Sequence, residues 1–346
     1  MKLVLFLFSI VLINYSFLDR STIKENNNIL TKKDSIEKYH FYINKAELNI
    51  CDSNYLQAIK LYETAFKYHY SPFPNDLYNA ALVAIYLQNN NKAIDYCEAL
   101  VKLGCDLKFF NQIPFNTLKS DKDVWNNFLI DYDSLRNIYY NSINQELKDK
   151  IHKLYIEDQK NYCSYKKFGI PMQIPQDLNF KRFKDILKYF GFPNHDIVGL
   201  NIKNDTIISL GPQNILLRHY YQKGNYDLSE FLINELFNGK IKPIEFIVVE
   251  EFKYKPYSYF GTDLMFKSQE NNYYIFDEFK QYLEIKKYNK NRKNFFMETY
   301  QDQLKKMIYK YIETGNKTKF VFLIYGISID VKDDYLIKDD RLRILK

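Results

Sequence analysis

His219, in the stretch NILLRHYYQKG, is the residue whose chemistry first suggests a functional site. An imidazole titrates near neutral pH, so His219 could act as a general base or donate a hydrogen bond to a ligand. The sequence marks no partner for His219. Glu251 is a further catalytic candidate, and Thr262 is a weak candidate nucleophile because the sequence has no G-x-S-x-G stretch. These three residues support a hydrolase-type enzyme. The alternative is that His219 packs between helices and hydrogen-bonds a backbone carbonyl.

Arg292 is the strongest candidate for binding. It follows Asn289 by three positions, so both side chains fall on one face of a helix. A guanidinium held rigidly there could bind a carboxylate or a phosphate. It could equally form an internal ion pair with Glu251 or Asp263.

The FGTD stretch provides the remaining binding candidates, Gly261 and Asp263. Glycine permits a backbone conformation or a close approach that other residues do not, so a turn here would place Thr262 and Asp263 at a loop tip. We expect His219 and Arg292 to share one polar cleft with this turn. Such a cleft would suit a small anionic ligand.

No metal or cofactor site is expected. The cysteines (Cys51, Cys97, Cys105, Cys163) and histidines (His40, His69, His152, His195, His219) show no C-x-x-C and no paired Cys/His spacing. We expect cysteines that are free or partly paired. The net charge of +7 is mild for 346 residues, which makes nucleic acid an unlikely partner.

The first residues have the proportions of a signal peptide. One lysine precedes an unbroken apolar run from Leu3 to Ile13, which is too short to span a bilayer. We expect residues 1–16 to be a leader, 17–33 a linker, and the protein to be exported to the periplasm or secreted, with no stable transmembrane span in the mature chain. The alternative is an uncleaved leader that anchors the chain to a membrane.

Residues 34–130 are predicted to form paired helices with a cap. The apolar positions of two helices match at an offset of 35 residues, including Ala58 with Ala93 and Tyr62 with Cys97. This stretch resembles tetratricopeptide repeats, a family that binds protein partners, and the small alanines fall where that family needs close helix approach. Trp125, with the aromatic residues near Phe110, is expected to cap the array. One long helix over residues 134–162, within a connecting segment 131–176, then leads to the second half.

Residues 177–346 are predicted to be rich in helix with little strand, so the chain is mainly α, with an α or α+β second domain. This half resembles a bacterial domain family of unknown function in the order of its motifs: Gly191 with Pro193, Val198 with Gly199, His219, NGKIKP, FIVVEEF, FGTD, and Asn289 with Arg292. The chain departs from that family's polar residues at Tyr221, Phe252 and Asp263, among others. These departures favour binding over catalysis.

Three function classes follow. The leading one is an exported scaffold or interaction protein, without enzymatic activity, that binds a protein partner through its helical repeats and another ligand through its C-terminal domain. The second is a hydrolase that uses His219 with Glu251 and Arg292. The third is an anion or nucleic-acid binder.

Overall fold

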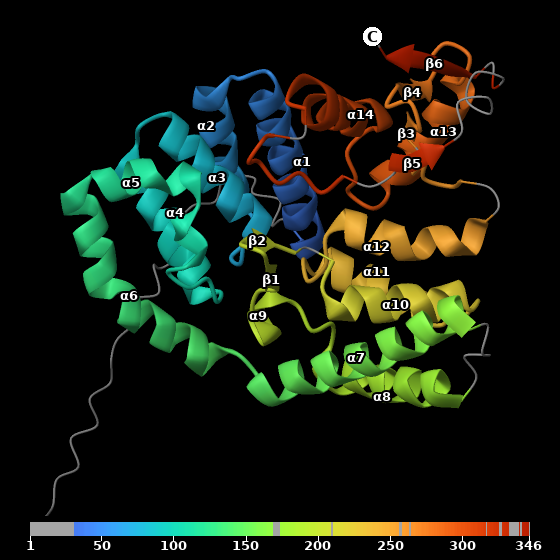
Figure 1. The fold of residues 1–346 in the computed structure, drawn as a ribbon, viewed down its shortest axis with the longest axis horizontal. Helices are drawn as coiled ribbons and strands as arrows, with labels where there is room; N and C mark the ends of the chain where they lie inside the picture. Colours follow the sequence, from blue (N-terminus) through green and yellow to red (C-terminus); the bar gives the residue numbers. More distant parts are fainter. Residues whose placement is uncertain are drawn as a thin grey trace, which may run out of the picture.

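A computed structural model describes residues 31–168, 174–208, 210–255, 258–262, 264–315, 317–324, 327–331, 339 and 341–345, without side chains for 161–177 and 327–331. The predicted leader, residues 1–16, and most of the predicted linker lie outside the described residues. Within them the chain is mainly α, as predicted, with two small sheets (Figure 1).

Four helices open the fold: α1 (Lys32–Cys51), α2 (Tyr55–Phe66), α3 (Pro74–Tyr86) and α4 (Asn90–Lys102). Local capping explains where they begin. Thr31, Asn54 and Asn89 accept first-turn N–H groups of α1, α2 and α4 with their side chains, and α3 begins with a proline. Ala58 and Ala93 are fully buried, as the sequence predicts. The identification of these helices as tetratricopeptide repeats stays a prediction.

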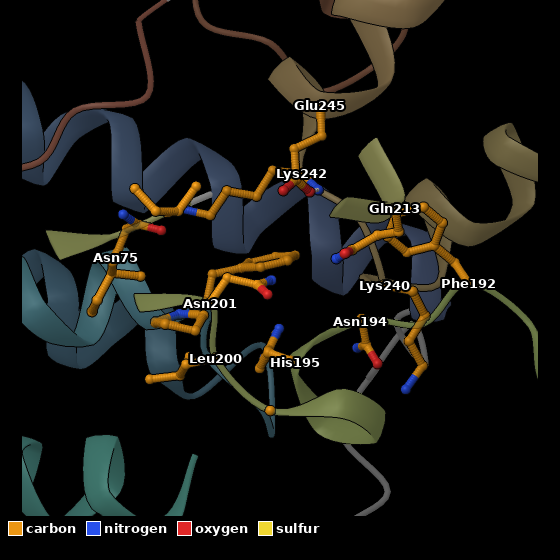
Figure 2. A pocket seen from close by; sticks show the side chains of 15 residues that line it. Asn75, Phe192, Asn194, His195, Leu200, Asn201, Gln213, Lys240, Lys242 and Glu245 are labelled. Carbon is orange, nitrogen blue, oxygen red and sulfur yellow. Dashed lines mark hydrogen bonds between the residues drawn. The ribbon is translucent and has the colours of Figure 1, made fainter. Parts of the chain in front are cut away.

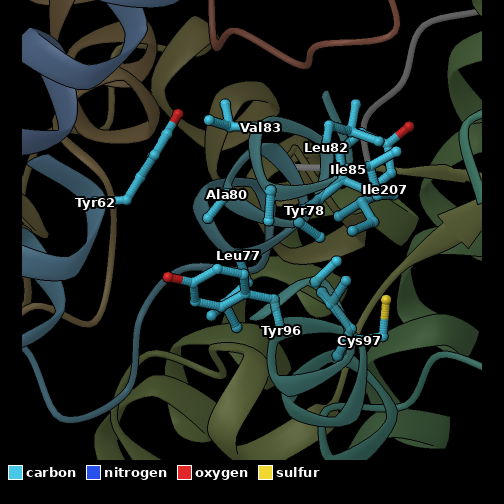
Figure 3. Packing of buried hydrophobic residues seen from close by; sticks show 14 of the residues in the cluster. Tyr62, Leu77, Tyr78, Ala80, Leu82, Val83, Ile85, Tyr96, Cys97 and Ile207 are labelled. Carbon is cyan, nitrogen blue, oxygen red and sulfur yellow. The ribbon is translucent and has the colours of Figure 1, made fainter. Parts of the chain in front are cut away.

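The expected cap lies over α4. It consists of two 3₁₀ turns, η1 (Phe109–Asn111) and η2 (Ile113–Phe115), then α5 (Asn116–Ser120) and α6 (Lys122–Ser142). Phe109, Phe110 and Phe115 are buried with edge-to-face ring contacts, and Trp125 packs against Phe128. Cys97 is a free buried thiol in the same core (Figure 3). Cys51 and Cys105 are also free.

The prediction of one long helix over residues 134–162 is wrong. The chain ends α6 at Ser142 and starts α7 (Gln145–Phe168) after an extended residue, Ile143. Asn144 explains the break, because its side-chain oxygen accepts the N–H of Leu147 and its own N–H donates to the carbonyl of Ile197. An asparagine favours such a cap over continuing the helix.

The next elements are α8 (Ile174–Phe190), α9 (His195–Val198) and a hairpin of β1 (Ile202–Lys203) and β2 (Thr206–Ile207). Asn204 and Asp205 both have positive φ, the conformation of a two-residue hairpin turn whose twist matches the strands. Then follow α10 (Pro212–Gln222), α11 (Ser229–Phe237), α12 (Pro243–Glu250) and the 3₁₀ turn η3 (Glu251–Tyr254). Helices α7, α8, α10, α11 and α12 enclose the second hydrophobic core.

The last part combines a four-stranded sheet with two helices. Strands β3 (Met265–Ser268), β4 (Tyr273–Phe276), β5 (Ile327–Val331) and β6 (Leu342–Leu345) lie in the order β5-β3-β4-β6, and only the β3–β5 pair is parallel. Helices α13 (Tyr282–Lys293) and α14 (Tyr300–Ile308) contribute to a third core with β3 and β4, and a π-helical turn, η4 (Tyr309–Glu313), extends α14.

The two halves of the chain interlock. Ile207 of the hairpin and the 320–322 segment complete the N-terminal core, while Ile36 of α1 belongs to the second core. Helix α1 also lies beside α14 and α11. No helix among the described residues combines the length and apolar character needed to cross a membrane.

Candidate functional site

His219 forms a histidine–carboxylate pair at the end of α10. Its Nδ1 lies 2.7 Å from Oδ2 of Asp158, and the Asp158 carboxylate is almost completely buried. Sequence reasoning missed Asp158, although a signal exists: it continues the buried stripe of α7 formed by Leu147, Ile151 and Leu154. An acid in an apolar stripe needs a partner, and His219 supplies it.

Glu251 organises the backbone of the FGTD region. Its carboxylate accepts the hydroxyl of Ser258 at 2.6 Å and the N–H groups of Tyr259 and Phe260 at 3.0 and 3.2 Å. The Ser258 oxygen in turn accepts the N–H groups of Gly261 and Thr262. These groups are therefore engaged in holding the chain rather than pointing at an open site.

Gly261 has a positive φ of +61°, a conformation that favours glycine, but the turn is not a loop tip. Gly261 and Thr262 are buried, and a Cβ at residue 261 would lie 2.4 Å from Cδ2 of Tyr288. Glycine is required here for close packing as well as for conformation. Asp263 lies outside the described residues.

Arg292 is completely buried, so it does not present its guanidinium to a ligand. Its Nη1 donates to the carbonyl of Phe260 at 3.0 Å, Nε donates to the carbonyl of Glu298 at 2.8 Å, and Nη2 bonds Gln303. Burial lowers the pKa of Arg292, with Glu298 acting in the opposite direction. The prediction of an open cleft around Arg292 is therefore wrong, because the guanidinium joins α13 to the FGTD segment.

Asn289 also has a structural role. Its side-chain oxygen accepts the N–H of Tyr300 at 2.7 Å and its amide donates to Gln301 at 3.0 Å, at the start of α14. The predicted site residues therefore lie in two separate places. Glu251, Thr262 and Arg292 surround one buried segment, whereas His219 is paired with α7.

A different site lies where the N-termini of three helices meet. A cavity of about 50 Å³ is bordered by the first turns of α3, α10 and α12, by α9 and by the hairpin (Figure 2). Its polar lining residues are Asn75, Asn194, His195, Asn201, Gln213, Lys240, Lys242 and Glu245. Phe73 and Phe192 contribute its apolar wall. None of these residues was singled out from the sequence as a site residue.

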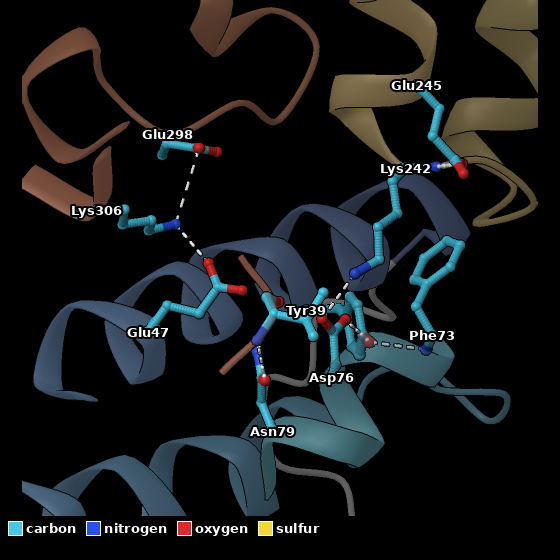
Figure 4. Close-up of polar contacts among 10 residues, drawn as sticks. Tyr39, Glu47, Phe73, Asp76, Asn79, Lys242, Glu245, Glu298 and Lys306 are labelled. Carbon is cyan, nitrogen blue, oxygen red and sulfur yellow. Dashed lines mark hydrogen bonds and ion pairs between the residues drawn. The ribbon is translucent and has the colours of Figure 1, made fainter. Parts of the chain in front are cut away.

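Buried ion pairs support this cavity. Lys242 donates to Oδ1 of Asp76 at 2.7 Å, and the hydroxyl of Tyr39 donates to the other oxygen at 2.5 Å (Figure 4). The same hydroxyl accepts the N–H of Phe73. The Asp76 side chain is fully buried, and the ion pair with Lys242 compensates for the loss of solvent around its charge.

A second buried ion pair joins α1 to α14. Lys306 contacts Glu47 at 2.5 Å and Glu298 at 3.8 Å. Burial works against the ammonium, but the two carboxylates outweigh it and raise the pKa of Lys306.

Two titratable groups in the cavity wall have shifted pKa values: near neutral pH Glu245 is partly charged and His195 is mainly uncharged. Burial raises the pKa of Glu245 to about 7, against the opposing N–H and ammonium of Lys242. Burial lowers the pKa of His195 to about 4, although Asp196 favours its charged form. Asp196 is held by Ser71, Asn194 and Lys240.

A large groove adjoins the cavity. It has a volume of about 1070 Å³ and lies between α6, α7 and the β1–β2 hairpin. Leu200, Asn201 and Ile208 line both the cavity and the groove, so the two are adjacent. Among the described residues, no group of three or more His, Cys, Asp or Glu side chains is placed to hold a metal ion.

Comparison with protein-family models, curated proteins and solved structures finds no match to the chain.

Proposed function

We propose that this protein is an interaction protein without enzymatic activity that binds an extended, acidic peptide segment of a partner in the groove between α6, α7 and the β1–β2 hairpin. The observation that carries this proposal is the groove itself. Its volume of about 1070 Å³ is at the upper end of sites that take small molecules, which suits a longer ligand.

The groove lining favours acidic peptides. Lys108, Lys148 and Lys203 line it together with His152, against two aspartates, Asp106 and Asp205. The Asp106 carboxylate is already engaged with the N–H of Phe109. The lysines leave a positive surplus that complements carboxylates.

Aromatic contacts add to this charge. Tyr139 and Tyr155 border the groove, and Lys148 donates to the Tyr139 hydroxyl at 3.1 Å. Amphipathic rings beside cations are typical of surfaces that bind partners.

The position of the groove links both predicted halves. Its wall includes Gly104 and Lys108, at the end of the helical array, and residues 200–205 from the second half. The hypothesis that α1 to α4 are tetratricopeptide-like repeats acting as a scaffold is a separate part of the proposal and rests on the 35-residue offset of their apolar positions. The apolar leader supports export to the periplasm or secretion. Intact-mass analysis of the exported protein tests this, and retention of Met1 on soluble cytoplasmic material would contradict it.

Selection of random displayed peptides on the purified full chain tests the groove. Acidic peptides should be enriched on the wild type and lost on the double variant Lys148→Glu, Lys203→Glu. The matched control is Lys286→Glu, Lys287→Glu, which makes the same charge change on the exposed face of α13. Equal retention on both double variants, each with an unchanged melting temperature, would refute the groove as the binding site.

The His219–Asp158 pair supports the alternative, a hydrolase, because a carboxylate on Nδ1 orients an imidazole for proton transfer at Nε2. Hydrolysis of p-nitrophenyl acetate, abolished in His219→Ala, would favour this alternative.

A further inference from the structure

Three helices direct their N-termini at the cavity described above. It is lined by Phe73, Pro74 and Asn75 at the start of α3, by Gln213 in the first turn of α10, and by Lys242 and Glu245 in the first turn of α12. Each helix has eight residues or more and begins with proline, which is favoured at the first helical position. Such N-termini attract negative charge.

The charges around the cavity leave room for one anionic group. Lys242 is paired with Asp76 at 2.7 Å, and Lys240 with Asp196 at 3.3 Å, so these side chains balance one another. Each helix N-terminus adds a partial charge of roughly +0.5. Three such termini together favour an anionic group in the cavity.

Two carboxamides in the wall have no hydrogen-bond partner among the described residues. Gln213 is nine-tenths buried, at 7% exposure, and Figure 2 shows its side chain extending from α10 into the cavity. Asn201 lies beside it across Gly211. A Cβ added at Gly211 would lie 2.4 Å from Nδ2 of Asn201 and 2.8 Å from Oε1 of Gln213. Gln213 is largely buried and Asn201 half-buried, and both side chains line the cavity, so the pair is suited to a polar ligand there.

We propose that this cavity binds a single carboxylate group, with the Gln213 and Asn201 amides as hydrogen-bond donors and the Glu245 carboxyl beside them. A volume of about 50 Å³ exceeds the space that one water needs and fits a group of a few heavy atoms. The carboxylate belongs either to a free small acid or to the C-terminus of a peptide lying in the adjoining groove. The second source rests on the proposed function.

Glu245 couples this binding to pH. Its pKa of about 7, raised by burial, keeps much of the group protonated at neutral pH, when it can donate to a carboxylate. Above that pH the two negative charges would repel. The charged and titratable groups around Glu245 are Lys242 of its own helix, Asp76 of α3, Lys240 and His195 in the cavity wall, and Tyr39 and His40 of α1 beside the Lys242–Asp76 pair. Helix α10 contributes the uncharged Gln213.

Calorimetric titration of the full chain with sodium formate and sodium acetate, against sodium chloride at equal ionic strength, tests the proposal between pH 6 and 8.5. Both ligands stay ionised over this range. The wild type should bind them most tightly at pH 6, and its affinity should fall by up to about tenfold for each pH unit above 7. Glu245→Gln should bind with an affinity that does not change with pH.

Two variants test the donors. Gln213→Leu should lose at least about tenfold in affinity at every pH. Gly211→Ala should do the same, because residue 211 has an ordinary negative φ and alanine would displace both carboxamides. Gln222→Leu, at the exposed end of the same helix, is the control and should bind as the wild type does. Melting curves establish that each variant is folded.

Absence of carboxylate-specific heat at pH 6, or full affinity in folded Gln213→Leu, would overturn the proposal. Peptides from the groove selection, with free or amidated C-termini, distinguish the sources. If only the free C-terminus binds tightly, the carboxylate is the end of a groove peptide. If formate binds but no peptide does, the cavity stands and the proposed function fails. If peptides bind and neither formate nor a free C-terminus adds affinity, the cavity proposal fails and the proposed function stands.

Discussion

The ion pair between Lys242 and Asp76 should be one of the most sensitive points of the molecule. Lys242→Met keeps the length of the side chain but removes its charge. Asp76 would then remain fully buried, and among the described residues its carboxylate would keep the hydrogen bond from the hydroxyl of Tyr39, 2.5 Å away. The pair also joins α3 to the start of α12, so its loss affects contacts between the two halves of the chain.

The size of the expected loss in stability follows from the burial of both side chains. The side chain of Lys242 is 8% exposed and that of Asp76 is 0% exposed, so solvent cannot replace the missing partner. Removing one member of such a pair lowers the free energy of unfolding by about 3 to 5 kcal/mol. The double variant Asp76→Asn, Lys242→Met buries no charge and should cost about 2 kcal/mol less than the sum of the two single changes.

Urea unfolding followed by circular dichroism measures these differences. Lys305→Met is the matched control, because its partner Asp52 lies at 2.6 Å but both side chains are about half exposed. An exposed pair contributes about 0 to 1 kcal/mol. Additive losses in the double variant, or a loss below about 1 kcal/mol in Lys242→Met, would refute the reasoning.

Three further outcomes are expected. Gly261→Ala should lower the free energy of unfolding by about 2 kcal/mol or more in urea unfolding, because alanine is strained at a φ of +61° and its Cβ would overlap Tyr288. Arg292→Met should cost at least about 3 kcal/mol by calorimetry, because it leaves the buried carbonyls of its partners without donors. Glu245 has a folded pKa of about 7 against an ordinary value of 4.5, so ionisation is less favourable in the folded state. Wild-type stability should therefore fall as pH rises from about 4.5 to 7, and that fall should be absent in Glu245→Gln.

Matched variants sharpen these outcomes. Gly224 also has positive φ, +82°, but a Cβ there meets nothing within 4 Å, so Gly224→Ala should cost only about 1 kcal/mol. An equal loss at both glycines would contradict the crowding argument. Lys293→Met, beside Arg292 but exposed, should change stability by less than about 0.5 kcal/mol. A Glu245→Gln profile that still falls with pH would show that other groups cause the dependence.

Much of the helical fold could be predicted because its signals are local. Asparagines and prolines mark helix starts, and the periodic burial of Ala58, Ala93 and Cys97 follows from apolar spacing. The break between α6 and α7 escaped prediction because a polar residue such as Asn144 is tolerated in a helix. It became a cap here through a contact with Ile197, far away in the sequence.

The candidate site was predicted poorly for a related reason. Residue types identified His219 and Arg292 as chemically capable, but their partners decide what such groups do. Arg292 meets carbonyls of Phe260 and Glu298, and His219 meets Asp158. Spacing along the chain carries no information about these contacts.

The sequence by itself indicated local features: a mainly α chain, buried alanines at positions 58 and 93, and a turn at Gly261. These depend on interactions within a few residues. Only the tertiary structure decided that the three proline-led helices point at one cavity, that Arg292 is enclosed, and that a groove separates α7 from the hairpin. Burial and desolvation are properties of the packed surroundings, which bring together residues more than a hundred positions apart.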